Sequence, residues 1–260
     1  MSEEVLLVAR EGRVATVTMN RAASKNALNP ALVDALGATM TKLGADEGVG
    51  AIVLTGAGEA FCSGADLKAA LADPSAMGDI EARLERFHDI IRAVVGAPQP
   101  VLAAVDGPAV GFGCDLALAC DLRIATSRAY FQEKFVRIGL VPDGGGSLWL
   151  PQMIGVGRAL ELMLTGDPIE GRRASELGLV NHVVAPEALL PTTLELARKI
   201  ASGPPLANAG IKRAVRASVC VVATALAHEK TEQLKCLHSQ DFLEGTLAWM
   251  QKREPQFSGK

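Results

Sequence analysis

The sequence predicts an α/β fold that ends in a helical extension. Strand-like apolar runs alternate with segments of helical periodicity up to about residue 185, and the strand-like runs then stop. Apolar residues make up 49% of the 260 positions, which is enough to fill the core of one large domain. Since no low-complexity linker separates the two parts, we expect them to form one continuous unit.

The strongest patterns are a hairpin and a series of buried strands separated by helices. Val5–Ala9 and Val14–Met19 flank the turn Glu11-Gly12-Arg13 and predict the hairpin. Asn29-Pro30 opens a helix whose apolar residues recur near the helical period. Further strands are expected at Ala51–Leu54, Val101–Val105, Leu122–Ala125 and Leu179–Val184, and helices at Ile80–Val95, at Cys114–Cys120, in short pieces over 146–178 and almost throughout from Pro186.

Composition excludes several classes of protein. The 26 basic and 29 acidic residues give a net charge of -3 without a basic patch, so we expect no nucleic-acid partner. The chain begins without a secretory signal pattern and contains no apolar run near the roughly 18 residues of a membrane span, which predicts a cytoplasmic protein without a membrane partner. Five cysteines without a C-x-x-C pair predict neither disulfides nor a metal site.

Gly56-Ala57-Gly58 follows a predicted strand, as the glycines of a dinucleotide-binding loop do. That loop needs a third glycine at the start of a helix, and Phe61 stands at this place. We therefore expect no dinucleotide cofactor.

Two longer motifs are more specific. They are Phe61-Cys62-Ser63-Gly64-Ala65-Asp66-Leu67-Lys68 and the stretch from Val105-Asp106-Gly107 through Gly111-Phe112-Gly113-Cys114-Asp115. Each places small residues after a strand and before a helix, where backbone N–H groups are free and the helix dipole is positive. Two such donors that point at one oxygen form an oxyanion hole. The structural alternative is that the small residues only permit tight packing of strand on helix.

Together and in this order, the two motifs resemble those of the crotonase (enoyl-CoA hydratase/isomerase) superfamily. Shorter matches extend the resemblance over nearly the whole chain: Asn20-Arg21, Lys25-Asn26-Ala27-Leu28, Leu164-Thr165-Gly166, Ala174 with Leu177-Gly178-Leu179-Val180, Glu244-Gly245 and Lys252-Arg253.

The resemblance implies a spiral of ββα repeats over residues 1–200 and a C-terminal helical trimerisation region over 201–260, in a homotrimer or a hexamer of paired trimers. The substrate would be an acyl-CoA thioester, with no separate cofactor. The backbone N–H groups of Ala65 and Phe112 would form the oxyanion hole, with Phe112 standing where the family usually has Gly. Lys25, Ala27, Ala65 and Leu67 fall where the family lines the coenzyme A channel, and Asp66, Phe135 and His88 are further candidates for contact with the substrate.

The acid–base residues separate the reactions of the family. Hydration requires two carboxylates that position water, and the family's hydratases carry Glu at the positions of Asp115 and Phe135. Phe135 cannot transfer a proton. Certain isomerases of the family, including the epoxyphenylacetyl-CoA and dienoyl-CoA types, instead use an Asp at the position of Asp143, in the turn Val141-Pro142-Asp143-Gly144-Gly145. One carboxylate suffices to move a proton between two carbons.

The sequence also allows other roles for these residues. Asp143 could cap the following helix, and Asp115 could serve the dipole of its own helix. His88 falls where aromatic acyl-CoA dehalogenases of the family carry a histidine, although a half-buried structural histidine is the alternative. The main hypothesis is an enoyl-CoA isomerase with Asp143 as the proton shuttle. The alternatives are a hydratase that uses Asp115 and Asp143, a dehalogenase-like enzyme, and a catalytically silent acyl-CoA binder.

Overall fold

The computed structural model describes residues 4–72, 79–219 and 221–259. Its larger sheet has six strands in the order β1-β2-β3-β4-β6-β9, where β1 pairs antiparallel with β2 and the other neighbours are parallel. The strands are β1 (Leu6–Glu11), β2 (Val14–Met19), β3 (Ala51–Gly56), β4 (Val101–Val105), β6 (Leu122–Thr126) and β9 (His182–Val184).

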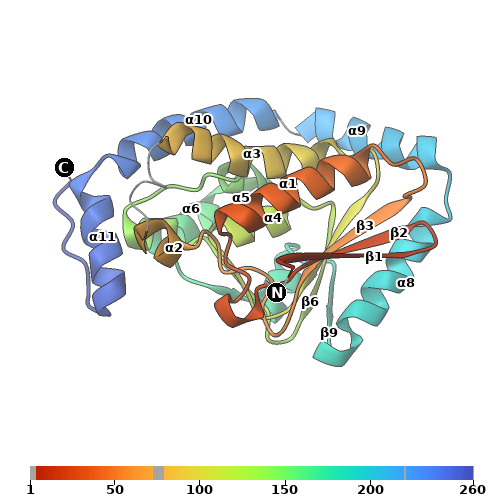
Figure 1. Ribbon diagram of the computed structural model, residues 1–260, viewed down its shortest axis with the longest axis horizontal. Coiled ribbons are helices and arrows are strands. Elements are labelled where there is room, and N and C mark those ends of the chain that lie inside the picture. Colours follow the sequence, from red (N-terminus) through yellow and green to blue (C-terminus); the bar gives the residue numbers. More distant parts are fainter. Residues whose placement is uncertain (1–3, 73–78, 220, 260) are drawn as a thin grey trace.

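Helices cover both faces of this sheet (Figure 1). On one face, α1 (Pro30–Gly44) packs against α3 (Ile80–Gly96) over the main apolar core. On the other face, α8 (Leu189–Ala201) contacts β3, β4 and β6 and closes a second, smaller apolar cluster. Strand β4 is buried throughout and β3 is buried up to Thr55, which explains why they are apolar runs without alternation.

A second sheet of three short strands stands beside the first, in the order β5-β7-β8. These are β5 (Pro108–Val110), β7 (Tyr130–Gln132) and β8 (Ile169–Glu170), with β5 and β7 parallel and β7 and β8 antiparallel. Helices α4 (Phe112–Ala119) and α7 (Gly171–Glu176) contact this sheet. The other short helical elements are η1 (Ala22–Ser24), α2 (Leu67–Ala72), η3 (Lys134–Ile138), α5 (Gly146–Ile154), α6 (Val156–Thr165) and η4 (Pro186–Ala188).

The predicted elements are confirmed, with several differences. Strand β1 covers Leu6–Glu11 instead of Val5–Ala9, so Glu11 belongs to the strand and not to the turn. The last strand begins at His182 rather than Leu179, because Leu179 and Val180 enter the core before the ladder with β6 starts. Helix α4 begins at Phe112, two residues earlier than predicted. The strands of the second sheet were not predicted, because runs of two or three residues carry no periodicity.

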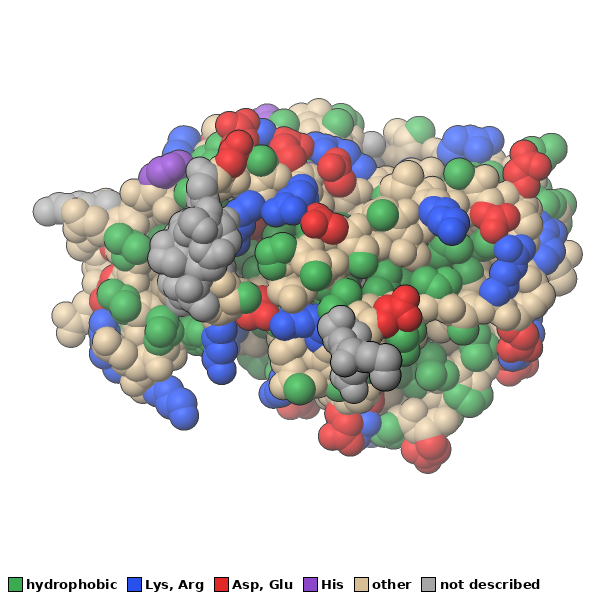
Figure 2. All heavy atoms as spheres, viewed as in Figure 1, with side chains coloured by type: hydrophobic (Ala, Val, Ile, Leu, Met, Phe, Trp, Pro, Cys, Tyr) green, Lys and Arg blue, Asp and Glu red, His purple; other side chains and the backbone are tan. Residues whose placement is uncertain are grey.

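Three helices complete the chain: α9 (Pro205–Val219), α10 (Val222–Leu237) and α11 (Gln240–Gln251). Helix α10 lies along α3 and contacts α5, whereas α11 contacts η3 (Figure 1). On the face drawn in Figure 2, acidic and basic side chains are interspersed. Within the described residues, no helix combines the length and the apolar character needed to span a membrane.

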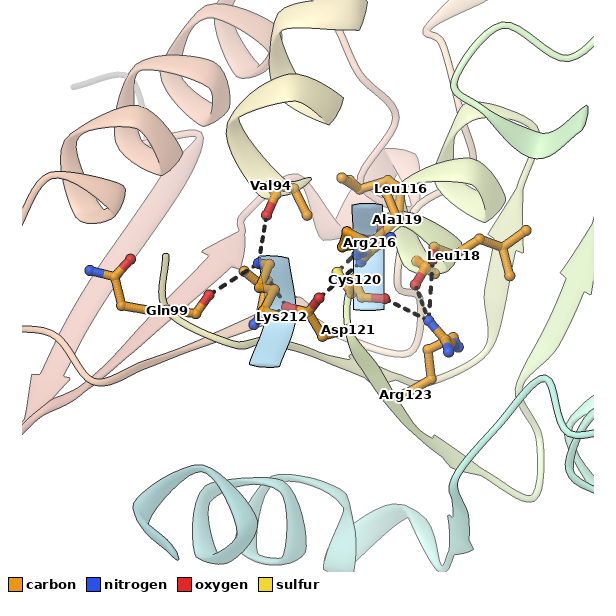
Figure 3. A network of polar contacts seen from close by, with 12 residues as sticks. Val94, Gln99, Leu116, Leu118, Ala119, Cys120, Asp121, Arg123, Lys212 and Arg216 are labelled. Carbon is orange, nitrogen blue, oxygen red and sulfur yellow. Dashed lines mark hydrogen bonds and ion pairs between the residues drawn. The ribbon is translucent and has the colours of Figure 1, made fainter. Parts of the chain in front are cut away.

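Helix α4 is fixed at its C-terminal end by two cations, the buried Arg123 and the partly buried Arg216 (Figure 3). The Arg123 guanidinium on β6 donates to the carbonyl oxygens of Ala117, Leu118 and Cys120, and also to that of Leu179. Arg216 of α9 donates to the carbonyl of Ala119 and to Asp121, which also pairs with Lys212. Cations at this end complement the helix dipole and satisfy the carbonyls that helix geometry leaves without partners.

We predict that Arg123→Met lowers the free energy of unfolding by about 3 kcal/mol, because buried carbonyl oxygens lose their donor. Arg173→Met is the matched control: Arg173 forms an exposed pair with Glu176, and its loss costs less than about 1 kcal/mol. Urea unfolding measures both values. Equal losses in the two variants would show that Arg123 does not hold the end of α4.

Candidate active site

The two predicted oxyanion segments lie against each other, and glycine permits the contact on each side. A methyl group on Gly64 would lie 2.8 Å from the Val110 carbonyl oxygen and 3.6 Å from the Phe112 nitrogen. A methyl group on Gly113 would lie 2.3 Å from the Cys62 carbonyl oxygen. Backbone hydrogen bonds from Val110 N–H to Cys62 O and from Cys62 N–H to Pro108 O hold the segments together. The sequence motifs therefore meet as predicted.

The backbone nitrogens of Ala65 and Phe112 have no hydrogen-bond partner among the residues that the structure describes. Phe112 is the first residue of α4, so its N–H lies in the first turn, where helix geometry supplies no acceptor. Ala65 is exposed, and its neighbours on both sides are bonded, since Gly64 O accepts from Leu28 N–H and Asp66 N–H donates to Leu28 O. Both nitrogens can therefore donate to an added oxygen. Their joint action on one substrate oxygen stays a prediction.

Two aromatic rings surround the start of α4. The Phe112 ring is buried and packs edge-on against Phe87 of α3, with centroids 4.7 Å apart. The Phe135 ring of η3 is also buried and lies near Gly111, the residue before Phe112. Phe112 therefore places its side chain in the core while its backbone nitrogen stays available, and Phe135 adds an apolar surface beside it.

The residues predicted to line the coenzyme A channel come together around the first motif. Ser63 N–H donates to the Lys25 carbonyl, which places Lys25 beside the motif, with its side chain exposed. Ala27 is buried and Leu67 begins α2. Asp66 has structural partners: it pairs with Arg21 at 2.9 Å and accepts from Ala69 N–H at the start of α2. The Asp66 carboxylate therefore has hydrogen-bond partners within the chain.

Asp115 is fully buried and packs against the glycine-rich turn 143–147. Its Oδ2 accepts a hydrogen bond from Gly144 N–H at 2.9 Å. A methyl group on Gly146 would lie 2.3 Å from Asp115 Oδ1 and 3.1 Å from Glu133 Oε1, so both carboxyl groups contact the same glycine. Burial, and then the charge of Glu133, raise the pKa of Asp115 well above its usual value.

Asp115 and Glu133 can form a hydrogen bond with each other only when one of the two carboxyl groups is protonated. With both groups ionised, Asp115 Oδ1 and the two oxygens of Glu133 have no partner. A proton on one of them creates a hydrogen bond between the two groups. Burial raises the pKa of Glu133 to about 8. This pair therefore holds a proton near neutral pH, which leaves Asp115 poorly suited to act as a base.

Asp143 has a different environment. Its Oδ2 accepts from Gln233 Nε2 of α10 at 2.8 Å, and its Oδ1 is buried without a partner. Burial raises the pKa of Asp143 to about 7, although the Gln233 hydrogen bond acts in the opposite direction. A carboxyl group that titrates near neutral pH and has one unoccupied oxygen can both take and return a proton.

The turn is also held by Glu229 of α10. This carboxylate accepts from Gly145 N–H at 2.7 Å, from Ser147 N–H at 3.0 Å and from the Ser147 hydroxyl. Burial raises the pKa of Glu229, and these hydrogen bonds counteract the shift. Among the described residues, no group of three His, Cys, Asp or Glu side chains is arranged to hold a metal ion.

His88 lies in the middle of α3 and is buried, with Nε2 unpartnered. Burial lowers its pKa, while a hydrogen bond with the Asp143 backbone acts in the opposite direction. The neutral ring thus packs behind the turn that carries Asp143.

Sequence reasoning missed Glu133, Glu229 and Gln233. A signal for the last two was present: they are four residues apart and three and seven residues beyond Leu226, on the buried face of an amphipathic helix. Two polar residues on an apolar face indicate a specific buried partner. Glu133 gave no such signal, because the short strand before it carries no periodicity in the sequence.

We predict that Gly146→Ala disrupts the carboxyl cluster, because the added methyl group would overlap Asp115 Oδ1. The expected cost is about 2 kcal/mol of folding free energy together with loss of activity. Gly157→Ala in α6 is the matched control, since nothing lies within 4 Å of the added group and the change there is less than about 1 kcal/mol. Thermal unfolding compares the two. Equal stability of both variants would mean that the cluster is loosely packed.

Comparisons with known proteins agree with this architecture. The family model described as enoyl-CoA hydratase/isomerase matches residues 9–260. The chain is 38% identical to a probable enoyl-CoA hydratase of Rhizobium meliloti (strain 1021) over 258 residues, covering 99% of both proteins. It is 36% identical to the 1,2-epoxyphenylacetyl-CoA isomerase of Escherichia coli (strain K12) over 260 residues, again covering 99% of both. The crystal structure of an enoyl-CoA hydratase from Mycobacterium avium subsp. paratuberculosis K-10 superimposes with a TM-score of 0.89 at 32% identity, over 98% of this chain and 99% of that one. The chain has the crotonase fold and belongs to the enoyl-CoA hydratase/isomerase family of enzymes.

Proposed function

We propose that this enzyme is an enoyl-CoA double-bond isomerase in which Asp143 shuttles the proton. The observation that carries the proposal is the contrast between two carboxyl groups. Asp143 has a buried oxygen without a partner and a pKa of about 7, whereas Asp115 is packed against Gly144 and Gly146 and shares a proton with Glu133. The carboxyl group of Asp143 can therefore act as a base, whereas that of Asp115 stabilises the fold.

The reaction needs three contributions from the chain. The N–H groups of Ala65 and Phe112 donate to the thioester oxygen and stabilise the negative charge that develops there. Asp143 Oδ1 removes a proton from C2 of a 3-enoyl thioester, which gives a dienolate and a neutral carboxyl group. The same carboxyl group returns the proton to C4, and the double bond moves to C2–C3. Phe135 supplies an apolar wall that disfavours addition of water.

A hydratase that uses Asp115 and Asp143 is the second candidate. The hydratase names among relatives at 36–38% identity support it. Hydration requires two carboxylates on one water, and the position of the second carboxylate in the family's hydratases is Phe135. The dehalogenase-like alternative is weaker, because it needs His88 at the substrate, and this ring is 1% exposed within α3. The free nitrogens and available carboxylate argue against a silent binder.

The proposal includes an acyl-CoA thioester as substrate, bound along Lys25, Ala27 and Leu67, and the isomerase needs no further cofactor. We also propose that the enzyme is cytoplasmic. Residues 1–200 form the catalytic spiral, and residues 201–260 serve assembly into a trimer or a hexamer. Leu243, Leu247 and Met250 support this last point, because they line one face of α11 and are 58%, 49% and 55% exposed.

If this face of α11 joins subunits, the double variant Leu243→Glu with Leu247→Glu should sediment as smaller species than the parent protein at micromolar concentration. Buried charges would oppose the association. Val8→Glu, at an apolar residue that is 52% exposed outside the helical tail, is the control and should leave the assembly intact. A parent protein that already sediments as a monomer would contradict the proposed assembly.

The assignment of the base predicts different effects for two conservative substitutions. Asp143→Asn should lower kcat for isomerisation by about 10²- to 10⁴-fold and leave acyl-CoA binding nearly unchanged. Asp115→Asn should cost less than about tenfold, because an amide oxygen still accepts from Gly144 N–H. In the parent enzyme, kcat/KM should fall as pH drops through about 7, since protonation of Asp143 removes the base.

Steady-state assays with 3-enoyl-CoA, followed by thioester absorbance, measure these effects. Isothermal titration with the product thioester controls for binding. An active Asp143→Asn enzyme together with an inactive Asp115→Asn enzyme would place the base on α4 instead of the turn.

A further inference from the structure

Helix α10 reaches the turn that carries Asp143 with two side chains that the reaction does not require as acids or bases. Glu229 and Gln233 are separated by four residues, so they project from one face of the helix. Both are polar, yet Glu229 is 5% and Gln233 1% exposed. Buried polar side chains are tolerated when their hydrogen bonds are satisfied, and here the partners belong to residues 141–147.

Gln233 binds both ends of the segment 141–143. Its Oε1 accepts from Val141 N–H at 3.0 Å, and its Nε2 donates to Asp143 Oδ2 at 2.8 Å. The Val141 N–H can only donate, which requires the amide oxygen on that side and turns the NH₂ group toward Asp143. One oxygen of Asp143 is therefore held, and the other, Oδ1, remains without a partner.

Glu229 fixes the other side of the same turn. It accepts from two backbone N–H groups, those of Gly145 and Ser147, and from the Ser147 hydroxyl. These residues open α5, where N–H groups are free and a negative charge is favourable. Asp143 thus stands between two anchors that come from one helix.

We propose that Glu229 and Gln233 are positioning residues: Gln233 holds Oδ2 of Asp143 and Glu229 holds the backbone that follows it, so that Oδ1 is the oxygen that takes and returns the proton. This inference rests on the proposed role of Asp143. It makes α10, a helix of the C-terminal extension, a part of the catalytic apparatus.

Gln233 also affects the pKa of Asp143. Donation from Gln233 favours the ionised form of Asp143 and counteracts the upward shift of the pKa that burial causes. The other titratable groups that face this region are Asp115 of α4, Glu133 before η3, Glu229 of α10 and His88 of α3. The charge of Glu229 raises the pKa of Asp143 further, and burial lowers the pKa of His88, so this ring supplies no compensating positive charge at pH 7. Gln233 is thus the side-chain donor that keeps the base ionised at neutral pH.

Two substitutions of Gln233 separate its roles. Gln233→Met preserves length but removes both the donor and the acceptor. Gln233→Glu retains an acceptor for Val141 N–H but replaces the donor with a further acid. Glu232→Gln is the control, because Glu232 is exposed on α10 and pairs with Lys235 on the surface.

We expect the acidic limb of the kcat/KM–pH profile to move upward by about one pH unit in Gln233→Met and further in Gln233→Glu. The kcat value at pH 7 should fall by about tenfold or more, with KM nearly unchanged, whereas Glu232→Gln keeps the parent profile. The ¹³C resonance of the Asp143 carboxyl carbon, assigned through its absence in Asp143→Asn, should report the same order of pKa values without any substrate.

The outcomes separate this inference from the proposed function. If Asp143→Asn is inactive but Gln233→Met keeps the parent profile and the parent carboxyl pKa, the positioning role is wrong and the isomerase assignment stands. If Gln233→Met loses activity without any shift in either titration, the residue only supports the fold, and the inference is overturned. An active Asp143→Asn enzyme would refute both.

Discussion

The central constraint of this structure is that several carboxyl groups are buried around one short glycine-rich turn. Charged carboxylates removed from water and placed near one another raise the free energy of the folded state unless donors or protons compensate them. The backbone of the turn supplies the donors: Gly144 N–H binds Asp115, and the N–H groups of Gly145 and Ser147 bind Glu229. Glycine is necessary here because the acids approach so closely that a methyl group on Gly146 would overlap one of them.

The four acids differ in how many hydrogen-bond donors or protons offset their burial, and this difference assigns them different roles. Glu229 accepts three hydrogen bonds, and Asp115 shares a proton with Glu133. Asp143 receives a single side-chain donor and keeps one oxygen unsatisfied. A carboxyl group left in this state is costly to the fold and useful to catalysis, because it titrates near neutral pH and has a free position for a proton.

The same helix that presents Asp115 also presents the backbone donor of Phe112. The C-terminal end of this helix is fixed by Arg123 and Arg216, while the Phe112 nitrogen at its other end lies near Gly64 of the first motif. This arrangement lets a large Phe occupy a position next to the reaction. The ring fills the core beside Phe87, and only the nitrogen is needed at the substrate.

Local periodicity predicted the α/β class and the positions of the main strands and helices along the chain, and the resemblance of the continuous motifs predicted the crotonase fold. The anchors of Asp143 could not be predicted in this way. Gln233 lies 90 positions beyond Asp143, and periodicity records which face of a helix is buried but not which distant group it meets. The partners of Asp66 were likewise not predicted: its oxygens bind Arg21 and the start of α2, and its contact with the substrate stays a prediction.

The claim that one carboxyl group carries the proton from carbon to carbon is tested most directly by isotope transfer. A 3-enoyl-CoA with two deuterons at C2 would be converted in ordinary water, and the 2-enoyl-CoA product analysed by NMR and mass spectrometry. A single shuttling Asp143 shielded from solvent predicts deuterium at C4 in part of the product, and no 3-hydroxyacyl-CoA. A 2-enoyl-CoA product without deuterium at C4, formed together with 3-hydroxyacyl-CoA, would show that Asp143 does not carry the proton between the two carbons.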